Sequence, residues 1–193
     1  MNASTLLQNV QRIRQHADCL YTQAEVDQAL DRMAAAITSD LSDKNPLCIG
    51  VLQGGLLPLG FLVQRLDFPL TVDYVHASRY RENLTGDKLV WQGTPAGTLA
   101  GRHVLIVDDI LDEGHTLAAL LAYCATQQPA SVRTAVLVHK QHDRGVQPQL
   151  DYCGLKVPAR YVFGCGMDYK GYWRNQSGIY AVADASTSSA TDG

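Results

Sequence analysis

A short stretch near the middle of the chain constrains its fold more than any other feature. Val104, Leu105, Ile106 and Val107 form a continuous apolar run, which is typical of a parallel strand buried on both faces. Two acids, at positions 108 and 109, follow this run directly. Because open α/β sheets bind their ligands beyond the carboxyl ends of their strands, we expect a functional site at this junction.

The residues after the two acids indicate what that site binds. Asp112, Glu113, Gly114, His115 and Thr116 lead into an apolar helical segment, so backbone amides and a hydroxyl at a helix amino terminus suit a phosphate group. Acids beside such a loop suggest a sugar phosphate with a diol and a divalent cation. The alternative is an ordinary strand-to-helix junction, but helix capping needs one acid rather than three in register.

The rest of the chain alternates between strand and helix patterns. Thr22 and Glu25 form a capping box ahead of an amphipathic helix. Buried strands are expected at 47–52, 71–77, 134–138 and 161–163, with helices at 57–66 and 116–127 and further extended structure at 88–92. Residues 79–87 are polar and predict a long exposed loop. This order predicts an α/β protein with a doubly wound sheet.

Composition limits the function classes that remain. With 193 residues, of which 46% are hydrophobic, one globular domain is expected over 1–184, with a disordered tail at 185–193. A net charge of −3 without a basic block favours neither nucleic acid nor membrane partners. The five cysteines have no metal-ligand spacing, and no apolar run resembles a signal peptide or a membrane span, so we expect reduced thiols and a cytoplasmic location.

The segment 104–116 resembles the phosphoribosyl-diphosphate (PRPP) signature of the type I phosphoribosyltransferases. The resemblance implies that family's fold, a doubly wound, mainly parallel sheet flanked by helices, with a small hood built from N- and C-terminal segments. It also implies that PRPP is bound by residues of the signature itself, namely Asp108, Asp109, Glu113, Gly114, His115 and Thr116.

Three further segments, in the same order along the chain, resemble the hypoxanthine-guanine branch of that family. Gln53 and Gly54 follow a buried strand, where relatives bind pyrophosphate, often through a cis peptide bond. Ser78 and Tyr80 open the polar loop and resemble a flexible lid that keeps water from the reacting ribose. Lys140 follows another strand, and the segment 160–174 supplies the remaining positions of a purine site.

The resemblance implies a role for each of these side chains. Asp112 would exchange a proton with a nitrogen of the purine's five-membered ring, and Arg174 would contact pyrophosphate. Lys140 would donate to the 6-oxo group, and Asp108 and Asp168 would hold Mg²⁺. Tyr161 would stack on the base, and the carbonyl of Val162 would accept from the exocyclic amine of guanine.

Some positions depart from the family pattern. Glu113 stands where Thr or Ser is common, so its carboxylate should point away from a phosphate and only its amide should face inward. His115 replaces a frequent Lys, Arg or Asn, and is either a pH-sensitive cation or a solvent-facing helix residue. Arg79 replaces a frequent Ser, which leaves the hydroxyl's role to Ser78 or to no residue.

The function expected from the resemblance is transfer of ribose 5-phosphate from PRPP to hypoxanthine or guanine, giving IMP or GMP and pyrophosphate. Enzymes for xanthine or a pyrimidine, a catalytically silent nucleotide sensor, and an RNA-binding regulator of the same fold are the alternatives. The regulator would need a basic face, which this acidic chain does not display. Oligomers are common among relatives, so a homo-oligomer, dimer or tetramer, is expected.

Overall fold

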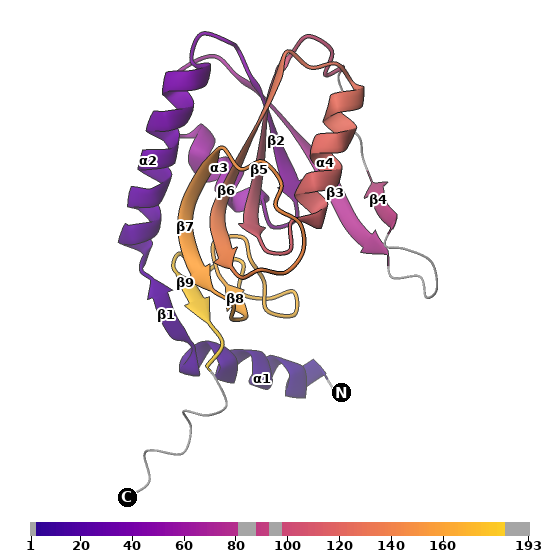
Figure 1. The fold of residues 1–193 in the computed structure, drawn as a ribbon. Helices are drawn as coiled ribbons and strands as arrows, with labels where there is room; N and C mark the ends of the chain where they lie inside the picture. Colours follow the sequence, from indigo (N-terminus) through magenta and orange to yellow (C-terminus); the bar gives the residue numbers. More distant parts are fainter. Residues whose placement is uncertain (1–2, 81–87, 93–97, 184–193) are drawn as a thin grey trace, which may run out of the picture.

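The computed structural model describes residues 3–80, 88–92 and 98–183, which form two sheets and four helices within that part of the chain (Figure 1). The helices are α1 (Ala3–His16), α2 (Gln23–Leu41), α3 (Leu56–Val63) and α4 (His115–Thr126). The strands are β1 (Asp18–Tyr21), β2 (Leu47–Leu52), β3 (Thr71–Tyr80), β4 (Lys88–Gln92), β5 (His103–Leu111), β6 (Ser131–Gln141), β7 (Tyr152–Pro158), β8 (Val162–Phe163) and β9 (Ile179–Ala181).

The larger sheet has the strand order β4-β3-β2-β5-β6-β7. All neighbouring pairs in it are parallel except β3 with β4. Helices α2 and α3 lie on one face and α4 lies on the other, as Figure 1 shows. The predicted doubly wound, mainly parallel sheet is therefore confirmed.

Strand β5 shows how the sequence produces this layering. Its residues are apolar at consecutive positions, and alternate side chains point to opposite faces of the sheet. Leu105 and Val107 join the core beneath α2 and α3, whereas Val104 and Ile106 join the core beneath α4. All four are at most 1% exposed, so the central strand needs apolar residues without interruption.

The smaller sheet has the order β1-β9-β8 and joins the two ends of the chain. Both of its strand pairs are antiparallel, and helix α1 lies across it in Figure 1. The Arg14 guanidinium of α1 stacks 3.9 Å from the ring centroid of Tyr180 in β9 and donates through Nε to Gln176 Oε1 at 2.7 Å. This small sheet, with α1 packed on it, is the expected hood.

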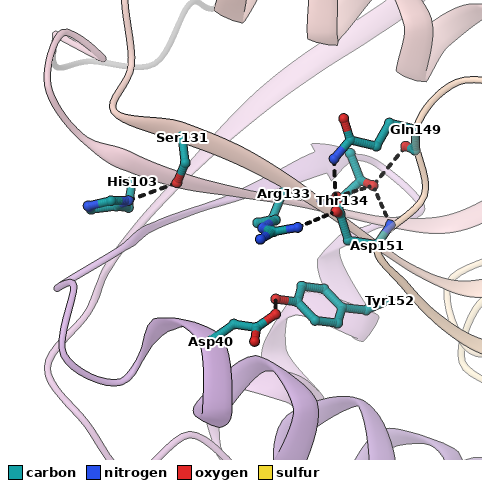
Figure 2. A network of polar contacts seen from close by, with 8 residues as sticks. All are labelled: Asp40, His103, Ser131, Arg133, Thr134, Gln149, Asp151 and Tyr152. Carbon is teal, nitrogen blue, oxygen red and sulfur yellow. Dashed lines mark hydrogen bonds and ion pairs between the residues drawn. The ribbon is translucent and has the colours of Figure 1, made fainter.

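A polar network fastens the edge strand β7 at the end of the sheet opposite the carboxyl ends of its strands (Figure 2). The Asp151 carboxylate accepts from Arg133 Nη1, from the backbone N–H of Thr134 and from Gln149 Nε2, each at 2.8 Å. The next residue, Tyr152, donates its hydroxyl proton to Asp40 Oδ2 of α2 at 2.7 Å. These contacts tie β6, β7 and α2 together without burying an unpaired carboxylate.

Several predicted element boundaries were wrong. The strand expected to end at residue 77 continues to Tyr80, where β3 pairs with β4. Ser78 and Tyr80 therefore lie in a strand rather than at the opening of a loop, because β4 supplies a hydrogen-bonded partner. Residues 81–87, the rest of the expected lid, and 185–193, the expected tail, lie outside the described residues.

The expected helix 57–66 is shorter, ending at Val63. Of the cysteines, expected to be reduced core thiols, Cys48, Cys124 and Cys165 are buried, while Cys19 and Cys153 are exposed. All five are free thiols. No helix among the described residues has the length and apolar character needed to cross a membrane.

Candidate active site

The carboxyl ends of the parallel strands meet at one edge of the larger sheet, and a cavity of about 310 Å³ opens there. Its walls come from the loop after β2, from the end of β5 with the loop that follows, and from the segment after β8. The predicted site residues that line it are Gly54, Asp108, Asp109, Asp112, Glu113, Gly114, Thr116, Asp168 and Arg174. The fold thus brings together residues separated by up to 120 positions in sequence, from Gly54 to Arg174.

Asp108 and Asp109 place two carboxylates next to each other in this cavity. Burial, reinforced by the neighbouring Asp109 carboxylate, raises the pKa of Asp108 well above its ordinary value. Burial also raises the pKa of Asp109, although hydrogen bonds and the charge of Arg174 act against that rise. Two carboxylates in such a setting favour the approach of a cation or of hydroxyl donors.

The loop after β2 approaches this pair closely. Gly54 leaves no room for a Cβ atom, which would overlap the Asp109 carboxylate. The Leu52–Gln53 peptide bond is cis, as the family resemblance suggests. Gln53 itself is exposed and is absent from the residues that line the cavity.

A second cavity, of about 260 Å³, adjoins the first. It is lined by Lys140, Tyr161, Val162 and Met167 and shares Asp109, Ile110, Asp112 and Asp168 with its neighbour. Tyr161 is 52% exposed, so its ring is available to a flat ligand, and it packs edge-on against Tyr169 at a centroid distance of 5.4 Å. The predicted purine-site residues therefore gather around one space.

Asp168 and Arg174 connect the hood segment to the first cavity. Arg174 Nη2 lies 2.7 Å from Asp168 Oδ1, and its Nη1 donates to the carbonyl of Gly166 at 2.6 Å. The other Asp168 oxygen accepts from the backbone N–H of Gly171 at 2.7 Å. Both side chains are thereby oriented at the first cavity, and Asp168 also lines the second.

Asp112 stands where the two cavities meet and has two side-chain partners. Lys140 Nζ donates to Asp112 Oδ2 at 2.6 Å, and His142 Nε2 lies 2.6 Å from Asp112 Oδ1. Burial acts to raise the pKa of Asp112, but the hydrogen bonds from Lys140 and His142 and the charge of Lys140 outweigh it and the pKa is lowered. Asp112 is thus held as a carboxylate, the form that can accept a proton.

The sequence pattern did not single out His142. Its partner is 30 positions away, and only the parallel pairing of β5 with β6 brings the two together. The only available signal was its place just beyond the predicted Lys140.

His115 and Glu113, the two residues of the phosphate loop that depart from the family pattern, lie in different surroundings. His115 begins α4, is exposed, and is absent from the cavity lining, in line with its solvent-facing alternative. Glu113 is half-buried and lines the cavity, and its backbone carbonyl accepts from Val146 N–H at 2.9 Å.

The side chains expected to hold Mg²⁺ are Asp108 and Asp168. Within 3–80, 88–92 and 98–183, no group of three or more His, Cys, Asp or Glu side chains is arranged to bind a metal. Asp108 and Asp168 nevertheless line one cavity. Because Mg²⁺ often takes only one or two carboxylates together with water and substrate phosphates, this pair fits the ion.

Comparisons with known proteins agree with this geometry. The phosphoribosyl transferase domain family matches residues 16–170. A hypoxanthine-guanine-xanthine phosphoribosyltransferase of Tritrichomonas foetus is 32% identical over 176 residues, covering 91% of this chain and 93% of the relative. A hypoxanthine-guanine phosphoribosyltransferase of Streptococcus pneumoniae is 32% identical over 157 residues, covering 81% of this chain and 87% of the relative.

A solved structure named as a hypoxanthine-guanine-xanthine phosphoribosyltransferase superposes with a TM-score of 0.79 at 32% identity, covering 86% of this chain and 97% of that one. Sequence and fold agree over most of both chains, and the signature of this family lines the cavity. The chain therefore belongs to the type I phosphoribosyltransferase family, in its hypoxanthine-guanine branch.

Proposed function

We propose that this protein transfers the 5-phosphoribosyl group of PRPP to hypoxanthine or guanine, forming IMP or GMP and releasing pyrophosphate. The observation that carries the proposal is the pair of adjoining cavities that share Asp109, Asp112 and Asp168. One cavity has acids and a helix amino terminus suited to a sugar phosphate. The other has an ammonium group and an exposed aromatic ring suited to a 6-oxopurine.

On the phosphate side, Asp108 and Asp109 bind the ribose hydroxyls, and the loop residues Gly114 and Thr116, with the amides of Glu113 and His115, bind the 5-phosphate. Arg174, Gln53 and Gly54 contact the pyrophosphate. Asp108 and Asp168 hold Mg²⁺, which when bound neutralises negative charge on the leaving diphosphate.

On the base side, Lys140 donates to the 6-oxo group, Tyr161 stacks on the ring and the Val162 carbonyl accepts from an exocyclic amine. Asp112 lines both cavities, so it can exchange a proton with a nitrogen of the five-membered ring while that nitrogen faces the ribose. Ser78 and Tyr80, at the end of β3, would help to cover the reacting groups, as the family resemblance implies. We expect the enzyme to work in the cytoplasm as a dimer or tetramer.

The test is product formation from hypoxanthine, guanine, xanthine and uracil, each with PRPP and Mg²⁺. We expect IMP and GMP to form fastest, and we expect Asp112→Asn to lower kcat about 10²- to 10⁴-fold, the usual contribution of a general acid or base. Asp143→Asn, a change of the same chemistry at an exposed position nearby, should leave kcat unaltered.

A preference for xanthine would show that the proposed purine substrates are wrong; the T. foetus relative has xanthine in its name. A preference for uracil would reject the purine assignment. Failure to form any nucleotide, with PRPP intact, would overturn the proposed activity.

A further inference from the structure

Asp112 contacts His142, a residue that lines neither cavity. The Asp112 side chain is 41% exposed, whereas its partners Lys140 and His142 are 12% and 7% exposed. Lys140 lines the base cavity, but His142 is absent from the lining of both cavities. A bound purine can therefore compete for Lys140 and leaves His142 in contact with Asp112.

The hydrogen bonds of His142 determine which of its ring nitrogens carries a proton. The backbone N–H of Arg144 donates to His142 Nδ1 at 3.1 Å. A backbone amide is always a donor, so Nδ1 must accept and the ring proton must reside on Nε2. The Nε2–H group then donates to Asp112 Oδ1 at 2.6 Å. A neutral imidazole satisfies both contacts, whereas a doubly protonated ring would lose the contact to Arg144.

The chain segment that carries His142 also supports the rest of the phosphate loop. Val146 N–H donates to the Glu113 carbonyl at 2.9 Å, and Gly114 packs against Val146 and Pro148. Segment 142–148 thus contacts residues 112, 113 and 114 in turn. This places the His142 ring at a fixed position relative to the Asp112 carboxylate.

We propose that His142 is a positioning residue of the transferase reaction, which holds the Asp112 carboxylate toward the base through its Nε2–H group while Lys140 turns to the 6-oxo oxygen. The inference rests on the proposed function. It predicts that the loss of this donor lowers the rate of the chemical step and leaves PRPP binding intact, because His142 lines neither cavity.

Three substitutions test the donor. His142→Leu removes it, His142→Asn shortens the side chain so that its amide falls near the Nδ1 position, and His142→Gln places an amide donor near the Nε2 position without a charge. We expect the Leu and Asn variants to lose about 10- to 100-fold in kcat, the range seen when a group that orients an active-site ligand is removed. KM for PRPP should stay within about twofold, and the Gln variant should recover most of kcat.

The matched control is Arg144→Ala, which removes an exposed side chain but keeps the backbone N–H that contacts His142. Its kcat should equal that of the native enzyme. The proposal is overturned if the Leu variant keeps full kcat, or if the Gln variant is no faster than the Leu variant.

A second measurement observes the His142 ring in the native protein. Nitrogen NMR of the native protein at neutral pH should show His142 with an unprotonated Nδ1 and a protonated Nε2, the resonance being assigned by its absence from the Gln variant. A proton on Nδ1 would overturn the arrangement even if the Leu and Asn variants failed to fold. If the native enzyme made no nucleotide but had the expected tautomer, the proposed function would fail and the hydrogen bond to Asp112 would stand.

Discussion

Asp108 and Asp112 belong to one segment, yet their surroundings move their pKa values in opposite directions. Desolvation and the neighbouring Asp109 carboxylate both favour the protonated form of Asp108. Asp112 is also partly buried, but Lys140 and His142 donate to it and favour its ionised form. The first setting suits a cation or hydroxyl ligand, and the second suits a proton acceptor.

Asp151 offers a test of how such contacts affect stability. Burial acts to raise its pKa, but hydrogen bonds from Arg133, Gln149 and Thr134 outweigh burial and lower the pKa below the ordinary 3.8. A lowered pKa in the folded state stabilises the fold at pH values above the unfolded pKa, and this contribution is lost as the pH falls through the folded pKa. We expect Asp151→Asn to lower the free energy of unfolding by about 1–3 kcal/mol at pH 7.

The measurement is urea unfolding of the native protein and the Asn variant over a pH series. The difference between them should persist to about pH 5 and shrink below about pH 4, because Asp151 of the unfolded chain then takes up a proton before Asp151 of the folded chain does. Asp67→Asn, at an exposed position, is the control and should cost little at any pH. A difference that grows on acidification would contradict the sign of the shift.

At the scale of single residues, the sequence predicted the site residues that directly follow a strand and match the family pattern. It did not predict residues whose role depends on a partner far away in the sequence. Asp112 and Lys140 stand just after apolar runs, and both line the base cavity. His142 has no periodic signal, because the contact that explains it joins two different loops. Gln53 and His115 were named as contacts of the ligand, and neither lines the cavity.

At the scale of elements, the junction of the phosphate loop with α4 depends on one glycine. Gly114 has φ of +75°, where a side chain costs about 1–2 kcal/mol, and a Cβ atom there would overlap the backbone carbonyl of Val146. Gly114→Ala should therefore displace the loop from segment 142–148. We expect KM for PRPP to rise about tenfold or more, since small misplacements of binding groups are costly.

Gly101→Ala separates the cost of a side chain at positive φ from the overlap with the Val146 carbonyl. Gly101 has a similar φ of +69°, but no atom lies within 4 Å of the position its Cβ would take. Its alanine variant should lose thermal stability without a change in KM for PRPP. Equal KM values for the two variants would show that the contact with Val146 has no role in shaping the loop.

The sequence predicted strands that are buried on both faces and a helix that begins with a capping box, because both leave a clear pattern in the residue types. Strands β2 and β5 are continuous apolar runs, and α2 begins with the predicted capping box. Strand β7 was missed because it is an edge strand with alternating burial, a glycine and a terminal Pro158. Strands β1 and β9 are only 4 and 3 residues long, too short for a period to be recognised.

At the scale of the whole molecule, the two cavities draw on both sheets. Strand β5 of the larger sheet and the loop after it supply Asp108, Asp109 and Asp112, and the chain on either side of β8 in the hood supplies Tyr161 and Asp168. The base site is therefore complete only when the hood is held against the larger sheet. Helix α1 stabilises the hood itself, because Trp173 Nε1 donates to the Val10 carbonyl at 2.9 Å and Arg14 stacks on Tyr180.

Arg14→Leu tests whether α1 supports the base site from a distance. The change removes a hydrogen bond to Gln176 and a cation–π contact with Tyr180, together worth about 1–2 kcal/mol. Tyr180 stacks on Phe163, at a centroid distance of 5.7 Å, next to the Val162 that lines the base cavity. We therefore expect a lower melting temperature and a KM that rises for the purine more than for PRPP. Arg12→Leu, on an exposed position of the same helix, should change neither quantity; equal increases in both KM values for Arg14→Leu would mean that α1 stabilises the whole fold and has no particular connection to the base site.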